Sequence, residues 1–161
     1  MPQSVKFNGR AFVANVPSGL GYGVPTAQVS SGLVAAVGDI LYLEAASNTF
    51  KKTGNTSAAV NAVDAIVVAA TGSVLPSGIA FTVMRTPCTV PLKTFGTLTA
   101  LQALGANKEA YVTAGRISNI DGTSAHFNNK LFTLPKTFVS LTQADYDTLL
   151  VTVQPSAPVS N

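Results

Sequence analysis

Short apolar segments recur along the chain from Gly32 onward, separated by glycine, proline and asparagine residues. They are four to six residues long and lie at residues 39–43, 65–70, 79–84, 110–113, 138–141 and 149–153. Valine, isoleucine, phenylalanine and tyrosine dominate them, and these side chains suit a pleated, half-buried surface. Strands of this length, with turn residues between them, predict an all-β fold, either a β-barrel or a β-sandwich.

Two short helical turns are expected beside the strands. Thr99, with Gln102 three residues later, has the pattern of a capping box, and Gly105 could end that turn. Thr142, followed by Asp145, could begin a second turn. Each turn is too short to be stable without packing against the strands.

The N-terminal part of the chain has a different pattern. Glycine occupies every second position from 19 to 23, and Pro25 follows. Such a segment cannot sustain a helix or a central strand. We therefore expect residues 1–31 to form an extended N-terminal arm that becomes ordered on a neighbouring molecule. A strand around residues 6–13, followed by a long loop, is the alternative.

A single β-domain then spans residues 32–154, and residues 155–161 form a C-terminal tail. The 161 residues suffice for one domain with a sizeable core and are few for two.

Two stretches of the domain share an order of elements. In the first, Gly38–Leu43 is followed by Asn48–Lys52 and Gly54; in the second, Lys108–Val112 is followed by Gly115–Ser118 and Asp121-Gly122. Each stretch continues with an apolar strand, at Ile66–Ala69 and Phe138–Leu141, and with a final strand, at Phe81–Met84 and Val151–Gln154. This order predicts one β-unit used twice, its two copies closing a single core.

Charged residues make up only 11% of the chain, against roughly 25% in typical soluble proteins. A surface with so few charges loses the repulsion that keeps copies apart. It suits a protein whose surface is covered by partners, since interface cores are depleted in charge. A threonine-rich β-protein without such partners is the simpler interpretation.

The net charge of +3 comes from scattered lysines and arginines, of which only Lys51 and Lys52 are adjacent. A nucleic-acid-binding surface requires clustered basic residues, so we expect no nucleic acid as a partner. No apolar run approaches the 18 residues of a membrane span, and the N-terminus lacks the layout of a signal peptide.

Residues that could carry chemistry are few. Cys88 is the only cysteine, which excludes an intrachain disulfide and fits a reducing cytoplasm. Cys88 and His126 could in principle form a nucleophilic pair, but a buried structural cysteine is the favoured interpretation. Asp145 and Asp147 could act as an acid pair, although they fit a polar turn better. We expect no enzyme activity, catalytic residue, metal, cofactor or small-molecule substrate.

Several of these patterns together resemble the small capsid decoration (cement) proteins of tailed phages. They are Gly-Asp-x-x-Tyr-Leu at residues 38–43, the hairpin with Lys51 and Lys52, the following Val/Ile/Ala strand, and Tyr-Val-x-x-Gly-x-Ile at residues 111–117. The resemblance covers roughly residues 32–154 and consists of β-hairpin patterns, so it transfers no individual site residue. It implies a β-barrel or sandwich-like protein, commonly a homotrimer, that clamps neighbouring capsomers from the outer surface of the shell.

The expected function is therefore that of a structural virion protein, made in the cytoplasm of the bacterial host. It would bind the major capsid protein and copies of itself. Its candidate interface residues lie in the N-terminal arm and are Val5, Phe7, Arg10, Phe12 and Tyr22. The apolar side chains would add to strand edges or fill grooves, and Arg10 would bridge to an acidic capsid surface. A head-fibre base, a tail protein, or a module that binds host surfaces or carbohydrate are the alternatives.

Overall fold

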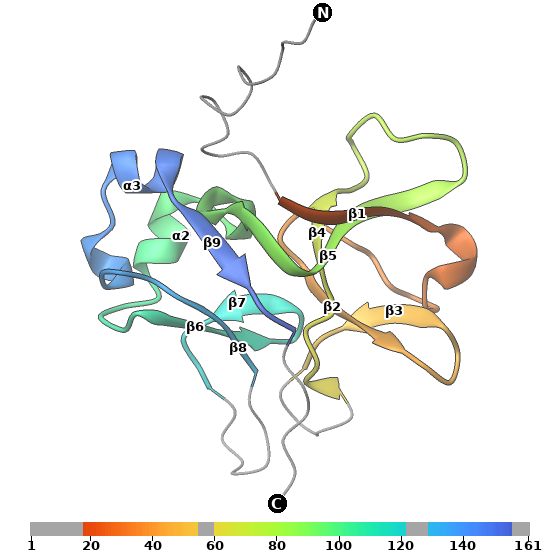
Figure 1. Cartoon of the computed structure of the whole chain (residues 1–161), viewed down its shortest axis with the longest axis horizontal. Coiled ribbons are helices and arrows are strands. Elements are labelled where there is room, and N and C mark those ends of the chain that lie inside the picture. Colours follow the sequence, from red (N-terminus) through yellow and green to blue (C-terminus); the bar gives the residue numbers. More distant parts are fainter. Residues whose placement is uncertain (1–17, 55–59, 122–128, 156–161) are drawn as a thin grey trace, which may run out of the picture.

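The computed structural model describes residues 18–54, 60–121 and 129–155, and its strands form two sheets (Figure 1). Val5, Phe7, Arg10 and Phe12 lie outside the described residues. The described elements are, in chain order, β1 (Ser18–Pro25), the 3-10 helix η2 (Thr26–Gln28), β2 (Ile40–Glu44), β3 (Thr49–Lys52), β4 (Ala65–Ala69), β5 (Ile79–Pro91), the 3-10 helix η4 (Leu92–Phe95), α2 (Leu98–Gln102), β6 (Glu109–Thr113), β7 (Arg116–Ser118), β8 (Lys130–Thr133), the 3-10 helix η5 (Phe138–Ser140), α3 (Gln143–Thr148) and β9 (Leu150–Val153).

All pairings between the strands are antiparallel. The larger sheet has the order β1-β5-β4-β2-β3, with β9 added to β5, and the smaller sheet has the order β7-β6-β8. The long strand β5 pairs with β1 and β4 along its first part and with β9 along its last four residues. The described strands thus form two open sheets without a closed barrel. The predicted all-β fold is confirmed, in a sandwich-like arrangement.

The middle strands of the larger sheet are buried on both faces. Because successive side chains of a strand point to opposite faces, Ile40 and Leu41 on β2 enter two different cores, as do Ile66 and Val67 on β4. This double burial explains why these strands appear in the sequence as continuous apolar runs rather than alternating ones.

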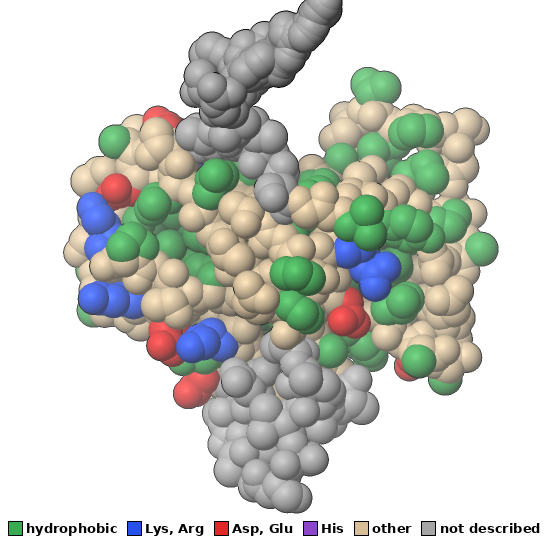
Figure 2. Space-filling model, in the orientation of Figure 1, with side chains coloured by type: hydrophobic (Ala, Val, Ile, Leu, Met, Phe, Trp, Pro, Cys, Tyr) green, Lys and Arg blue, Asp and Glu red, His purple; other side chains and the backbone are tan. Residues whose placement is uncertain are grey.

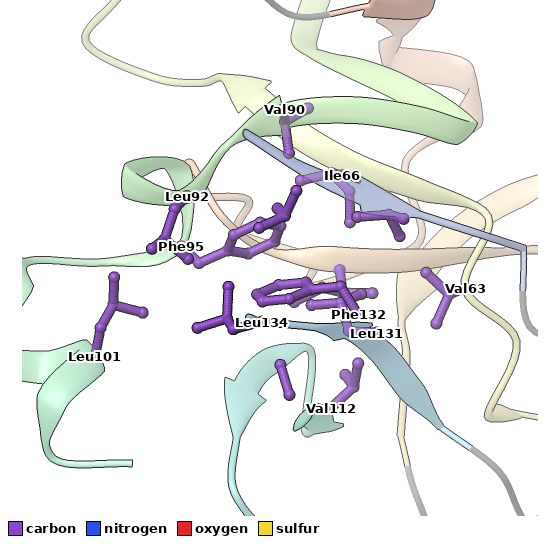
Figure 3. Close-up of a cluster of buried hydrophobic side chains, with 14 of the residues drawn as sticks. Val63, Ile66, Val90, Leu92, Phe95, Leu101, Val112, Leu131, Phe132 and Leu134 are labelled. Atoms are coloured by element: carbon purple, nitrogen blue, oxygen red, sulfur yellow. The ribbon is translucent and has the colours of Figure 1, made fainter. Parts of the chain in front are cut away.

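The large core fills the space between the two sheets and contains eighteen buried residues of the described chain. Figure 3 shows part of it, with side chains from both sheets, η4 and α2 converging. The rings of Phe95 and Phe132 lie 5.4 Å apart, and those of Phe132 and Phe138 lie 6.4 Å apart. Burial of so much apolar surface is the main favourable contribution to folding.

The small core lies on the other face of the larger sheet. Its eight buried residues are Val24, Leu41, Phe50, Ala65, Val67, Ala70, Phe81 and Val83. Side chains from β1 and from the segment between β1 and β2 pack against it. An isolated parallel bridge joins Val29 to Phe50 of β3, so the segment after η2 lies along the far edge of the sheet.

The structure places the start of the domain earlier than the sequence predicts. Ser18–Pro25, expected to belong to the extended arm, is strand β1 at the edge of the larger sheet. Gly19 has a φ of +137°, and a Cβ there would lie 2.8 Å from the Cβ of Cys88. Glycine therefore allows β1 to approach β5, instead of preventing strand formation. The expected arm is wrong for the β1 part of residues 1–31, whereas residues 1–17 lie outside the described residues.

Two further predictions need correction. The segment 138–141, predicted as a strand, contains the 3-10 helix η5 at Phe138–Ser140, with Phe138 in the large core and Val139 exposed. The first helix begins after Thr97, whose side chain accepts a hydrogen bond from the backbone N–H of Ala100, so Thr99 is not its cap.

The second helical prediction is confirmed. The hydroxyl of Thr142 accepts from the N–H of Asp145, and the Asp145 carboxylate accepts from the N–H of Thr142, which completes a capping box.

Candidate protein-binding surface

Two long stretches of the sequence contain no charged residue, namely residues 11–38 and 65–84. Their described parts adjoin in the larger sheet, because β1 pairs with β5 and β5 pairs with β4. We call residues 18–38 and 65–84 together the uncharged lobe. Figure 2 shows charged side chains on the left, over the smaller sheet and α3, whereas the upper right, over the β4–β5 loop, is hydrophobic or uncharged.

The uncharged lobe also exposes apolar side chains. Of the six large hydrophobic residues that are exposed in the described part of the chain, four lie in the lobe: Leu20, Val34, Val37 and Val74. Leu20 is 71% exposed and Val74 is fully exposed, at 103%. Single exposed apolar residues are ordinary, but several within a charge-poor region are typical of a surface that another protein covers.

Strand β1 gives this lobe an open sheet edge. One edge of β1 pairs with β5, and no other described strand pairs with its second edge. Natural edge strands are usually protected by charged side chains, proline or bulges. β1 has register irregularities at its two ends, between Ser18 and Leu20 and between Val24 and Pro25, but the part between them contains no charge and no proline. Its free N–H and C=O groups can accept an added strand.

Arg85 lies in register beside this edge, opposite Leu20 of β1 and Ala65 of β4. Its guanidinium carbon is 5.7 Å from the centre of the Phe50 ring. The Nε atom of Arg85 is buried without a hydrogen-bond partner, and none of the ion pairs among the described residues involves Arg85. The guanidinium of Arg85 thus lies against an aromatic ring and has no carboxylate partner among the described residues.

Tyr22 is the one candidate interface residue that the structure describes. Its ring packs against the small core, 6.4 Å from the ring of Phe50, and its hydroxyl donates to the side-chain oxygen of Gln28. Gln28 in turn donates to the carbonyl of Asn48, at 3.4 Å. Tyr22 therefore helps to fix the segment after β1 over the sheet, whereas Leu20, two residues earlier on the same face, lies outside the small core and is exposed.

A buried carboxylate joins the two sheets. Asp39, 1% exposed, accepts a hydrogen bond from Arg116 at 2.6 Å and lies 3.7 Å from the Nζ atom of Lys52. The N–H of Ala36 also donates to it, at 2.8 Å. The neighbouring N–H of Ile40 donates to the carbonyl of Gly115, in the β6–β7 turn. The Gly-Asp pattern at residues 38–39 thus forms the joint between the sheets.

The described side chains that were considered for chemistry have structural roles instead. Burial raises the pKa of the Cys88 thiol to about 11, which keeps it protonated and unreactive at neutral pH. The hydrogen bond from Lys136, together with those from Thr142, lowers the pKa of Asp145 to about 2. Asp147 accepts from the side chain of Gln143, at 3.1 Å. His126, the other half of the possible nucleophilic pair, lies outside the described residues.

A search of the described residues for other sites gave none. They contain no group of three or more His, Cys, Asp or Glu side chains that could hold a metal ion, and no pocket opens between them. None of the helices in the described ranges is long and apolar enough to cross a membrane.

The uncharged lobe was not predicted as a surface, although the two charge-free stretches are visible in the sequence. Only the pairing of β1, β5 and β4 shows that they adjoin. Comparisons with models of known protein families, with curated proteins and with solved structures found no match to this chain.

Proposed function

We propose that this chain is a structural virion protein of a tailed phage. It binds the outer surface of the capsid as a homotrimer and bridges neighbouring subunits of the major capsid protein. The observation that carries the proposal is the uncharged lobe, with its exposed apolar side chains and the open edge of β1. A surface of this composition is suited to lasting coverage by protein neighbours.

The physical action of such a protein is to add binding energy across the joints of a shell. A standard interface buries roughly 1,200–2,000 Å². Attachment to several subunits at once turns modest individual contacts into long residence. Because the protein binds the assembled shell and not the separate subunits, it shifts the equilibrium toward the assembled form.

The proposal includes a β-unit that is used twice. Its support is the shared order of strands around β2 and β6: each is flanked by its hairpin partner, β3 or β7, and by a later strand, β4 or β8. In the second unit β8 takes the place expected for residues 138–141. The likeness ends at the fourth strand, since β5 pairs with β4 whereas β9 pairs with β5.

Co-sedimentation with purified shells of the phage that carries the gene tests the function. We expect the full chain to sediment with intact shells in a fixed ratio to the coat protein, and light scattering to give the mass of a trimer in solution. Leu20→Asp is expected to reduce the bound amount at least tenfold, because it places a charge in the uncharged lobe. Val139→Asp is the matched control, an exposed apolar residue outside the lobe, and is expected to bind normally.

A full chain that fails to sediment with shells would disprove the proposal, and so would equal losses for the two variants. Truncation should stop before β1. Removing residues 1–17 leaves all described strands in place, whereas removing residues 1–31 also removes Val24 from the small core and is expected to destabilise the fold.

A further inference from the structure

We propose that the open edge of β1 and the adjacent Arg85 together bind an extended segment of another protein that carries an aspartate or glutamate. This inference rests on the proposed function and names the chemistry of its partner. The segment adds an antiparallel or parallel strand beside Gly19–Val24, and its carboxylate pairs with the guanidinium of Arg85.

The first argument is the unpaired charge of Arg85. A partly buried guanidinium loses hydration, and this loss is normally offset by hydrogen bonds to a carboxylate or to carbonyl groups. In the described chain the guanidinium lies over the Phe50 ring, and its Nε atom is buried without an acceptor. The interaction with the ring leaves the planar, forked donors of the guanidinium free for a carboxylate.

The second argument is the position of Arg85 relative to the edge. It stands opposite Leu20 in the register, on the same face of the sheet. A strand added to β1 would place every second side chain on this face, roughly 10 Å from the backbone of β5, a distance that Arg85 and a long acidic side chain can span together. One acidic side chain there would meet Arg85, and an apolar neighbour would cover Leu20.

The third argument concerns the opposite face of β1. Gly19 and Gly21 are exposed there and leave the backbone uncovered. A Cβ at Gly21 would have no neighbour closer than 3.7 Å, the sulfur of Met84. Glycine in an edge strand permits close approach of another backbone and leaves room for large side chains of the added strand.

The occupant is a different protein and not a second copy of this chain. Two β1 edges paired with each other would join two uncharged strands and would leave both Arg85 residues without a carboxylate. None of the described strands with an open edge, β1, β3, β7, β8 and β9, contains an aspartate or glutamate that a second copy could place beside β1. The missing carboxylate therefore comes from the partner.

Short peptides of alternating threonine and valine with a central glutamate test the inference on the full-length chain. Versions with glutamine or lysine at the centre are the comparison probes. In ¹H–¹⁵N NMR titrations, we expect the glutamate peptide to shift the amide signals of residues 18–24. We expect it to bind about tenfold more tightly than the glutamine peptide, which is the size of one charge-assisted hydrogen bond, and to weaken with added salt.

Variants of the chain assign the effect to Arg85. Arg85→Gln is expected to abolish the preference for glutamate, and Arg85→Lys to retain part of it, since the charge remains but the fork is lost. Lys93→Gln is the matched control, because Lys93 is exposed on η4 away from β1, and is expected to keep the full preference.

Equal shifts with all three peptides, shifts away from β1, or a preference that survives in Arg85→Gln would overturn the inference. Amide signals of β1 that shift with protein concentration alone would show that a second copy occupies the edge. If the full chain sediments with shells and Arg85→Gln sediments equally well, the inference fails while the proposed function stands. If the full chain does not sediment, the function itself fails.

Discussion

The two faces of the larger sheet are covered in different ways. On one face the large core is closed by a second sheet, two 3-10 helices and α2, with eighteen buried residues among those described. On the other face the small core has eight, and β1 and loop segments cover it. Regular elements close the first face, whereas loop segments cover much of the second, on which Leu20 is exposed opposite Arg85. If the proposed function is right, the face with the small core is also the one used for recognition.

The strongest test of this division is to remove one fully buried ring from each core. Phe138→Ala and Phe50→Ala are each expected to lower the free energy of unfolding by about 3–5 kcal/mol, since each deletes a large buried side chain. Because the cores share β2, β4 and β5, urea unfolding should show one transition in both variants. A separate early transition in Phe50→Ala would show that the small core unfolds by itself.

Substitutions at the joint between the two sheets are expected to have the next largest effect on the free energy of unfolding. Asp39→Ala removes the acceptor of Arg116 and of the Ala36 N–H, and we expect a loss of about 2 kcal/mol in the free energy of unfolding. The loss stays moderate because Arg116 and Lys52 are half-exposed and remain hydrated. Arg116→Gln is expected to cost at least as much, because it leaves the buried Asp39 carboxylate with Lys52 as its only cation among the described residues, and a clearly smaller loss would contradict this account.

The close contact of β1 with β5 can be tested at two neighbouring glycines. Gly19→Ala is expected to lower stability by about 1–3 kcal/mol, because its φ is +137° and its Cβ would lie 2.8 Å from the Cβ of Cys88. Gly21→Ala, whose Cβ has no contact below 3.7 Å, should change stability by less than about 1 kcal/mol. Equal thermal shifts for the two variants would show that β1 is not held in this register.

The smallest expected effect is on how the stability of the fold depends on pH. The pKa of Asp145 is lowered from 3.8 to about 2 in the folded chain, so its carboxylate stabilises the fold above pH 4. That contribution is lost as the pH falls from about 4 to about 2. Asp145→Asn is therefore expected to be less stable than the unmodified chain at pH 7, with a difference that narrows over this range. A difference that stays constant from pH 7 to pH 2 in thermal unfolding would contradict the pairing with Lys136 and Thr142.

Much of the fold follows from local sequence patterns. The apolar runs of β2, β4 and β5 and the capping box at Thr142 were predictable because each is a local pattern of side chains. Strand β1 was not predicted, because its glycines were interpreted as flexibility. The alternation of Leu20, Tyr22 and Val24 was the signal for a strand, but its support comes from β5, more than fifty residues later.

The remaining differences between the predicted and the observed elements also arise from tertiary contacts. Phe138–Ser140 has the composition of a strand, yet three residues of 3-10 helix suffice to direct Phe138 into the large core. The candidate surface shows the limit most clearly. The few charged residues can be counted in the sequence. The adjacency of the two charge-free stretches, and the lack of an ion-pair partner for Arg85 among the described residues, depend on strand pairing.

The length of β5 has a mechanical consequence. Its thirteen residues carry β1 along the first part and β9 along the last, so one continuous backbone connects the open edge to the large core. A pull on a strand attached to β1 would pass into β5 through a ladder of hydrogen bonds loaded together, without crossing a loop. For a protein proposed to hold the joints of a pressurised shell, tension would then end in the larger of its two cores.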